Sequence, residues 1–98
     1  MYEIRKTDVF VRWLDTLADR CGRAKILSRL DRVAEGNLGD TKPVGQGVAE
    51  LRIVFGPGYR VYYTKHRNVV VILLLGGDKS SQQKDIQRAI QMSQDLEE

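Results

Sequence analysis

A chain of 98 residues, 42% of them hydrophobic, can bury one core but not a core plus a separate module, so we expect a single domain over residues 1–98. The net charge of +3 is modest, and the one cysteine, Cys21, excludes an intrachain disulfide and a thiolate metal cluster. Because the N-terminus is charged and the longest apolar run, residues 69–75, is far too short to cross a membrane, we expect a soluble cytoplasmic protein with no membrane partner.

The N-terminal part of the chain predicts a short strand followed by a helical hairpin. Residues 2–6 can form the strand, and Thr7 or Asp8 can cap a helix that ends at Gly22. A second helix is predicted over residues 23–35, with Gly36 as the left-handed residue at its C-terminus. Apolar residues recur every three or four positions in both helices, which predicts two buried stripes. They are Phe10, Trp13, Leu14, Leu17 and Cys21 in the first helix, and Ile26, Leu27, Leu30, Val33 and Ala34 in the second.

The C-terminal part predicts three antiparallel strands and a last helix. Residues 36–46 contain three Gly and one Pro and indicate a loop. Strands are predicted over residues 47–55, 59–66 and 69–75 from alternating or β-branched sequence, and Ser80 or Ser81 can cap the helix that follows. The order predicts an α+β fold in which the helical hairpin covers one face of a three-stranded sheet and leaves the other face partly open.

The first two of these strands place two arginines on the same face. A turn at residues 56–58 would pair residue 55 with 59 and residue 52 with 62. Arg52, Arg60 and Tyr62 then lie opposite the core face, because side chains alternate along a strand. Gly76 and Gly77 would let the backbone bend and bring Lys79 to the same place. The predicted core face carries Leu51, Ile53, Phe55, Val61 and Tyr63.

Basic residues also concentrate in this part of the chain. Residues 41–80 contain six Lys and Arg against two acidic side chains, an excess of four. A local basic surface suits a phosphate-bearing partner, since affinity for a polyanion depends on local charge. The cluster therefore predicts an anion site.

Two longer strings carry a family resemblance. GVAELRIVFGPGYRVYY at residues 47–63 and LLLGGDKSSQQKDIQRA at residues 73–89 strongly resemble the RelE/ParE toxin superfamily, in particular its HigB-like addiction module killer branch. The resemblance covers nearly the whole chain. It implies a RelE-like fold and the toxin of a type II toxin-antitoxin pair, without cofactor or metal.

The resemblance also implies an activity and partners. In the RelE and HigB branches the toxin enters the ribosomal A site and cleaves mRNA, as the ribose 2′-hydroxyl attacks the adjacent phosphate. The cognate antitoxin is expected to be encoded next door, usually with a helix-turn-helix domain, and DNA is expected to be bound only through it. Two alternatives stay open: a ParE-like poison of DNA gyrase, or a catalytically weak member that only binds its antitoxin.

The candidate site residues follow from the predicted strand faces and from the family resemblance. We expect Arg52, Arg60, Lys79 and Tyr62 to be catalytic, with Lys84 joining the first three in RNA binding. Fixed guanidinium groups stabilise the charge that builds on a phosphorane-like transition state, but Arg cannot move protons. Several nuclease relatives carry Tyr, or Asp, Tyr and His, near the start of the last helix. This chain has Gln83, Lys84 and Asp85 there, and Glu50 where some RelE proteins place Lys, so the candidates for proton transfer are Lys79, Tyr62 and Asp85.

Each candidate has a simpler alternative. Arg52 could form a surface ion pair with Glu50, whereas Arg60 has no acidic neighbour nearby in sequence. Lys79 could be a solvated turn residue, and Tyr62 could either stack on a base or fill space under the last helix. His66, the only histidine, adjoins the distal turn and is not expected in the site. The basic residues of the second helix, expected to be a solvated face or a grip on ribosomal RNA, are Arg23, Lys25, Arg29 and Arg32.

Overall fold

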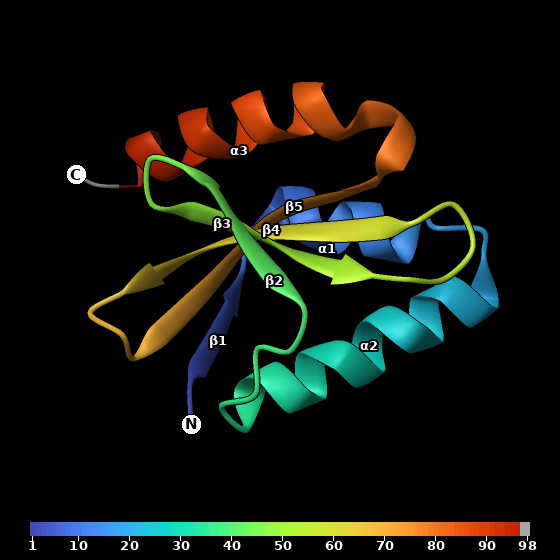
Figure 1. Ribbon diagram of the computed structural model, residues 1–98, viewed down its shortest axis with the longest axis horizontal. Helices are drawn as coiled ribbons and strands as arrows, with labels where there is room; N and C mark the ends of the chain where they lie inside the picture. The colour runs from blue at the N-terminus through green and yellow to red at the C-terminus, as the bar shows by residue number, and fades with distance from the viewer. Residues whose placement is uncertain (97–98) are drawn as a thin grey trace.

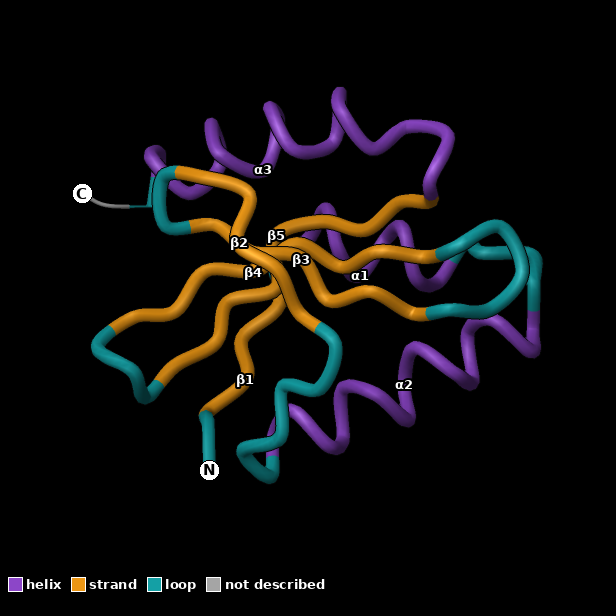
Figure 2. The backbone as a smooth tube through the Cα atoms, viewed as in Figure 1, coloured by secondary structure: helices purple, strands orange, loops and turns teal. Residues whose placement is uncertain are grey.

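The computed structural model describes residues 1–96, which form a five-stranded sheet with helices on both faces (Figures 1 and 2). The elements are β1 (Glu3–Lys6), α1 (Asp8–Asp15), α2 (Arg20–Ala34), β2 (Thr41–Gly45), β3 (Val48–Ile53), β4 (Tyr59–His66), β5 (Val70–Asp78), a 3-10 turn (Lys79–Ser81) and α3 (Gln82–Asp95). Figure 1 shows α3 on one side of the sheet and α1 and α2 on the other. Among these helices, none combines the length and apolar character needed to cross a membrane.

The sheet is larger than the sequence predicted. Its strand order is β1-β5-β4-β3-β2, with β1 parallel to β5 and the other pairs antiparallel. The α+β class is confirmed, but the three-stranded sheet is wrong. Residues 41–45, expected in a loop, form the edge strand β2, where Pro43 is tolerated because an edge strand leaves some N–H groups unused.

The boundary between the first two helices also differs from the prediction. Thr7 caps α1 as expected, accepting a hydrogen bond from the Phe10 amide at 3.1 Å. However, α1 ends at Asp15, and Asp19 caps a second helix by accepting from the Gly22 amide at 2.9 Å. Gly22 therefore lies in the first turn of α2, where a Cβ atom would come within 2.5 Å of the Tyr59 ring. Cys21 lies in the first turn of α2 and is exposed rather than packed.

Two hydrophobic cores hold the sheet between the helices. The first lies under α1 and α2 and contains Leu51, Ile53, Val61 and Tyr63, so the predicted core face is confirmed, with Phe55 partly buried at its margin. Leu27, predicted in the α2 stripe, is instead 40% exposed. The second core lies under α3, which covers much of the face expected to be open. Its buried members are Val48, Tyr62, Leu74, Leu75 and Ala89.

One buried arginine joins α2 to the sheet. Arg29 is only 9% exposed, and its guanidinium donates hydrogen bonds to the carbonyls of Arg52, Leu38 and Asp40 at 2.7, 2.8 and 2.6 Å. This residue is therefore neither part of a solvated face nor able to grip RNA. It fixes the end of β3 and the loop before β2 against α2.

We expect Arg29→Met to destabilise the fold by about 3–5 kcal/mol, because three carbonyls lose a charged donor while the apolar stem is kept. Urea unfolding followed by circular dichroism would measure the change. Arg32→Met, at an exposed position one helical turn further on, is the matched control. Equal stability of the two variants would contradict the bridging role of Arg29.

A second prediction concerns acid stability. The amide of Gly22 and the hydroxyl of Tyr59, which donates at 2.7 Å, lower the pKa of Asp19 below its ordinary value of 3.8. A carboxylate whose folded-state pKa is depressed stabilises the protein above its unfolded pKa, and this contribution is lost as the pH falls through the folded pKa.

Asp19→Asn keeps a good capping side chain but removes the charge. We therefore expect this variant to be less stable at neutral pH and to lose less stability than the wild type below about pH 4. Urea midpoints between pH 2 and pH 7 would show it, with Asp31→Asn, on the exposed side of α2, as control. Parallel pH profiles for wild type and Asp19→Asn would contradict the assignment.

Candidate functional site

Three cationic side chains surround one small pocket at the end of the β3–β4 hairpin. Arg52 and Arg60 are direct partners in the antiparallel register, so their side chains lie on the same face. The predicted pairing was two residues out of register, which kept the faces correct but not the partners. Arg52, Arg60 and Lys79 line a pocket of about 180 Å³ together with residues 53–56, Gly58 and Tyr59, and these three cationic side chains give it the name cation pocket below.

The turn of this hairpin fixes Arg60. Gly58 has a φ of 80°, and a Cβ atom there would lie 3.4 Å from Arg60 Nη1 and 3.7 Å from Lys79 Cβ. Its carbonyl accepts from Arg60 Nη1 at 3.0 Å. On the neighbouring strand, Arg60 faces Gly77, which has no side chain to compete for space. The guanidinium is therefore held close to the turn and to the start of the 3-10 segment.

A buried carboxylate lies beneath the two arginines. Glu50 is only 2% exposed, with Oε2 at 3.9 Å from Arg52 Nε and Oε1 at 3.7 Å from Arg60 Nε. Gln82 at the start of α3 donates to Oε1 at 3.1 Å. Arg60 has no acidic neighbour nearby in sequence, but the β3–β4 pairing brings in Glu50 from ten residues away. The Arg52–Glu50 pair is not a surface pair either, since one partner is buried.

Tyr62 lies on the same face but inside the protein. It is the β4 partner of Glu50, it is 0% exposed, and its hydroxyl has no hydrogen-bond partner among the described residues. Burial, with the negative charges of Glu50 and Asp85 adding to it, raises the pKa of the Tyr62 hydroxyl well above its ordinary value. Of the two roles considered, the structure places this ring under α3 rather than where a base could stack.

The segment after β5 positions the remaining candidates. Asp78 caps the 3-10 turn by accepting from the Ser80 amide at 2.9 Å, and it also accepts from the Ser80 hydroxyl. The hydroxyl and the amide of Ser80 together lower the pKa of Asp78. Ser81 makes no capping hydrogen bond and instead donates to Asp85 Oδ2 at 2.6 Å. Lys79 and Lys84 are both exposed and line a second, open hollow of about 490 Å³ over residues 79–84.

The two glycines before this segment act differently from the prediction. Gly76 and Gly77 continue β5 rather than bend it. A Cβ atom at Gly76 would lie 2.3 Å from the Trp13 ring, and one at Gly77 would lie 2.0 Å from Asp85 Oδ2. They allow close approach of α1 and α3 to the strand. His66 lies at the opposite end of β4, paired with Val70, outside the cation pocket.

The functional feature that sequence reasoning missed is the buried charge partner of the arginines. From the sequence, Glu50 is a surface neighbour of Arg52 and stands where some RelE proteins place Lys. Its position two residues from Arg52 indicated the same face, but only the β3–β4 register and the Gln82 contact show that it is enclosed. Within residues 1–96, no three His, Cys, Asp or Glu side chains gather around a possible metal position.

Comparisons with known proteins agree with this architecture. A chain of the crystal structure of the toxin-antitoxin complex RelBE2 from Mycobacterium tuberculosis matches with a TM-score of 0.63 and 22% identity, over 80% of this chain and 98% of that one. The fold is thus RelE-like. Residues 12–95 match the model of the family described as Phage derived protein Gp49-like (DUF891), so the chain belongs to this family.

A sequence relative spans almost the same length. An uncharacterized protein of Haemophilus influenzae is 48% identical over 94 residues, which cover 96% of this chain and 95% of the relative.

Proposed function

We propose that this protein is the toxin of a type II toxin-antitoxin pair, related to the HigB-like branch, and that it cleaves mRNA on the ribosome without a metal ion. The observation that carries the proposal is the pocket that brings Arg52, Arg60 and Lys79 together. The fold shared with a chain of a toxin-antitoxin complex supports it. The proposed partners are the ribosome, mRNA and an adjacently encoded antitoxin.

The pocket suits a phosphodiester that is being cleaved. The ribose 2′-hydroxyl attacks the adjacent phosphorus and the 5′-oxygen of the next nucleotide leaves, which yields a 2′,3′-cyclic phosphate and a 5′-hydroxyl. Negative charge builds on the non-bridging oxygens during this step, and Arg52 and Arg60 stabilise it with charged donors. Lys84, one turn into α3, binds a neighbouring backbone phosphate.

Proton transfer falls to a smaller set of groups. Arginine stays protonated, and the raised pKa of Tyr62 keeps its hydroxyl neutral. Because Tyr62 is fully buried, it supports the site from beneath the pocket. Lys79 is exposed at the pocket and donates a proton to the leaving oxygen, a solvent water accepts the proton of the attacking 2′-hydroxyl, and Asp85 is engaged by Ser81. The ribosome aligns the attacking hydroxyl, since orientation alone lowers such barriers by several kcal/mol.

We expect Arg52→Ala and Arg60→Ala each to reduce cleavage about 100- to 1000-fold, because each removes a donor to the transition state. The assay maps new 5′ ends in cellular transcripts after tightly controlled induction. Arg5→Ala, at an exposed position of β1, should cleave like the wild type. Growth arrest without new 5′ ends, accompanied by loss of gyrase supercoiling activity, would overturn the nuclease proposal in favour of a gyrase poison.

A further prediction concerns the role of Glu50 beneath the two arginines. This carboxylate holds both guanidinium groups from below and also neutralises part of their charge. We expect Glu50→Gln to bind RNA more tightly, because the site gains a net positive charge, but to turn over about tenfold more slowly, because Arg60 loses its orientation. Steady-state cleavage at varied concentrations of programmed ribosomes gives kcat and KM separately.

A lower kcat together with a lower KM in Glu50→Gln identifies this role. A merely destabilised fold would lower the active fraction and would leave KM unchanged. Glu50→Ala serves as the comparison, since it removes the charge and also leaves a cavity. Unchanged kcat in Glu50→Gln would show that the carboxylate does not orient the arginines.

A further inference from the structure

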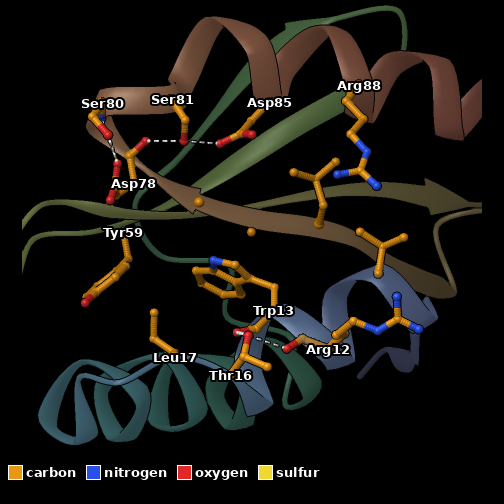
Figure 3. Close-up of a pocket in the computed structure, with 14 residues that line it drawn as sticks. Arg12, Trp13, Thr16, Leu17, Tyr59, Asp78, Ser80, Ser81, Asp85 and Arg88 are labelled. Carbon is orange, nitrogen blue, oxygen red and sulfur yellow. Dashed lines mark hydrogen bonds between the residues drawn. The ribbon is translucent and has the colours of Figure 1, made fainter.

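A groove outside the cation pocket is larger than either hollow described above. It measures about 570 Å³ and opens between α1 and the start of α3, beside the last residues of β5 (Figure 3). This volume falls within the range of about 300–1,000 Å³ that small-molecule sites occupy. The lining shares only Tyr59 with that of the cation pocket, so the groove is a separate site.

Side chains form the walls of this groove and also close its floor. Residues 75–77 of β5 are buried. A Cβ atom at Gly76 would lie 2.3 Å from the Trp13 ring, and one at Gly77 would lie 2.0 Å from Asp85 Oδ2. The indole ring and the carboxylate therefore cover the strand, and an occupant of the groove meets side chains rather than backbone.

Trp13, the only tryptophan of the chain, gives the groove an aromatic wall. Its ring centroid lies 5.9 Å from that of Phe10 and 6.3 Å from that of Tyr59, with the Tyr59 ring edge-on at 68°. Tyr59 is itself held by its hydrogen bond to Asp19 at 2.7 Å. The indole is thus fixed before a ligand arrives. Fixed aromatic side chains of this kind hold unstacked nucleobases.

The two ends of the groove differ in charge. Figure 3 shows Arg12 on α1 and Arg88 on α3 toward one end, and Asp78 toward the other. Both arginines are exposed, and within residues 1–96 neither forms an ion pair. Two guanidinium groups without an acidic partner favour a phosphate, because its oxygens accept several charged hydrogen bonds. The carboxylate at the far end disfavours a second phosphate.

Asp85 is the carboxylate that can read a base. Its Oδ2 accepts from Ser81 at 2.6 Å, which orients the side chain and leaves Oδ1 free of hydrogen bonds from residues 1–96. A carboxylate can accept two parallel hydrogen bonds from a partner with two adjacent donors. Guanine presents such a pair, N1–H and the N2 amino group, on its Watson–Crick edge. Asp78 is less suited, since one of its oxygens already accepts from both the amide and the hydroxyl of Ser80.

We propose that this groove binds one guanine nucleotide. The base packs against Trp13 and donates to Asp85, and the phosphate is held by Arg12 and Arg88. The nucleotide is either free or part of a single-stranded RNA, because both present the same base and phosphate. Only RNA as the source rests on the proposed function, whereas the aromatic wall and the charges belong to the groove itself.

Titration of the protein with guanosine 5′-monophosphate (GMP) tests the site directly. The fluorescence of Trp13 reports on this groove, because the chain has no other tryptophan and Trp13 does not line the cation pocket. We expect saturable quenching by GMP, since the base packs on the indole. Inosine 5′-monophosphate (IMP), which lacks the amino group, and guanosine, which lacks the phosphate, should each bind about tenfold more weakly.

Variants assign the two ends of the ligand. Arg12→Ala combined with Arg88→Ala should weaken GMP binding at least about tenfold. Arg5→Ala combined with Lys6→Ala, two exposed positions of β1 outside the groove, removes the same charge and should bind like the wild type. Asp85→Ala should bind GMP and IMP equally, because the carboxylate that distinguishes them is gone. Thermal unfolding of each variant checks that it is folded.

A short RNA separates the two sources of the nucleotide. The RNA contains one guanosine and carries 2′-O-methyl groups throughout, so the 2′-oxygen cannot attack the phosphate. Tighter binding of this RNA than of GMP, lost in the Arg12 and Arg88 double variant, would assign the groove to an RNA strand. Binding of GMP without binding of the RNA would assign it to the free nucleotide.

Three results would overturn the inference. The first is an absence of quenching by GMP, or equal binding of GMP and IMP to the wild type. The second is quenching that Arg52→Ala removes and the groove variants retain, which would place the nucleotide in the cation pocket. The third is quenching only by the adjacently encoded protein, which would assign the groove to a protein partner.

These outcomes are independent of mRNA cleavage, which is measured with the Arg52 and Arg60 variants. A protein that binds GMP in the groove but cleaves no RNA would leave this inference intact and reject the proposed activity. A protein that cleaves RNA but binds no nucleotide in the groove would do the reverse.

Discussion

The cation pocket depends on the hydrogen bonds by which Arg29 holds the β3 backbone. This guanidinium contacts the carbonyl of Arg52 itself, together with two carbonyls of the loop that leads into β2. A residue whose own backbone is fixed to a helix presents its side chain with less freedom, which the proposed function requires of Arg52. Arg29 on α2 therefore positions Arg52 on β3.

Glu50 offsets the repulsion between Arg52 and Arg60 in the cation pocket. Two guanidinium groups on directly opposed strand positions repel each other, and like charges across a strand pair destabilise a sheet. A carboxylate buried within 4 Å of both offsets this repulsion, and Gln82 donates a hydrogen bond to it. Burying the carboxylate costs desolvation, which the two cations compensate. Of the two arginines, Arg52 keeps 42% of its side chain exposed, whereas Arg60 keeps 12%.

Local patterns were sufficient for the core and for the faces of the strands. Alternation placed Leu51, Ile53, Val61 and Tyr63 correctly, because a buried face requires it. The break between α1 and α2 escaped prediction, since Leu17 and Cys21 continue the helical spacing while the capping hydrogen bond of Asp19 decides the boundary. β2 escaped because its Pro and Gly resemble a loop, and only pairing with β3 makes it a strand.

The enclosure of Glu50 could not have been predicted, because it is formed by elements distant in sequence. Glu50 and Gln82 are 32 positions apart and come into contact only once α3 covers the sheet. Pairing of β1 with only half of β5 is a tertiary outcome, set by where Thr7 begins α1. Sequence periodicity describes single elements, so it carries no information on such an edge.

The end of β5 connects the cation pocket to the start of α2. Asp78 ends this strand and caps the turn that carries Lys79, which lines the cation pocket. Tyr59, the β4 partner of Asp78, lines the same pocket, and its hydroxyl donates to Asp19, the residue that caps α2. The position of Lys79 therefore depends on the pairing of β4 with β5, and the same strand end is joined by Tyr59 to the helix that carries Arg29.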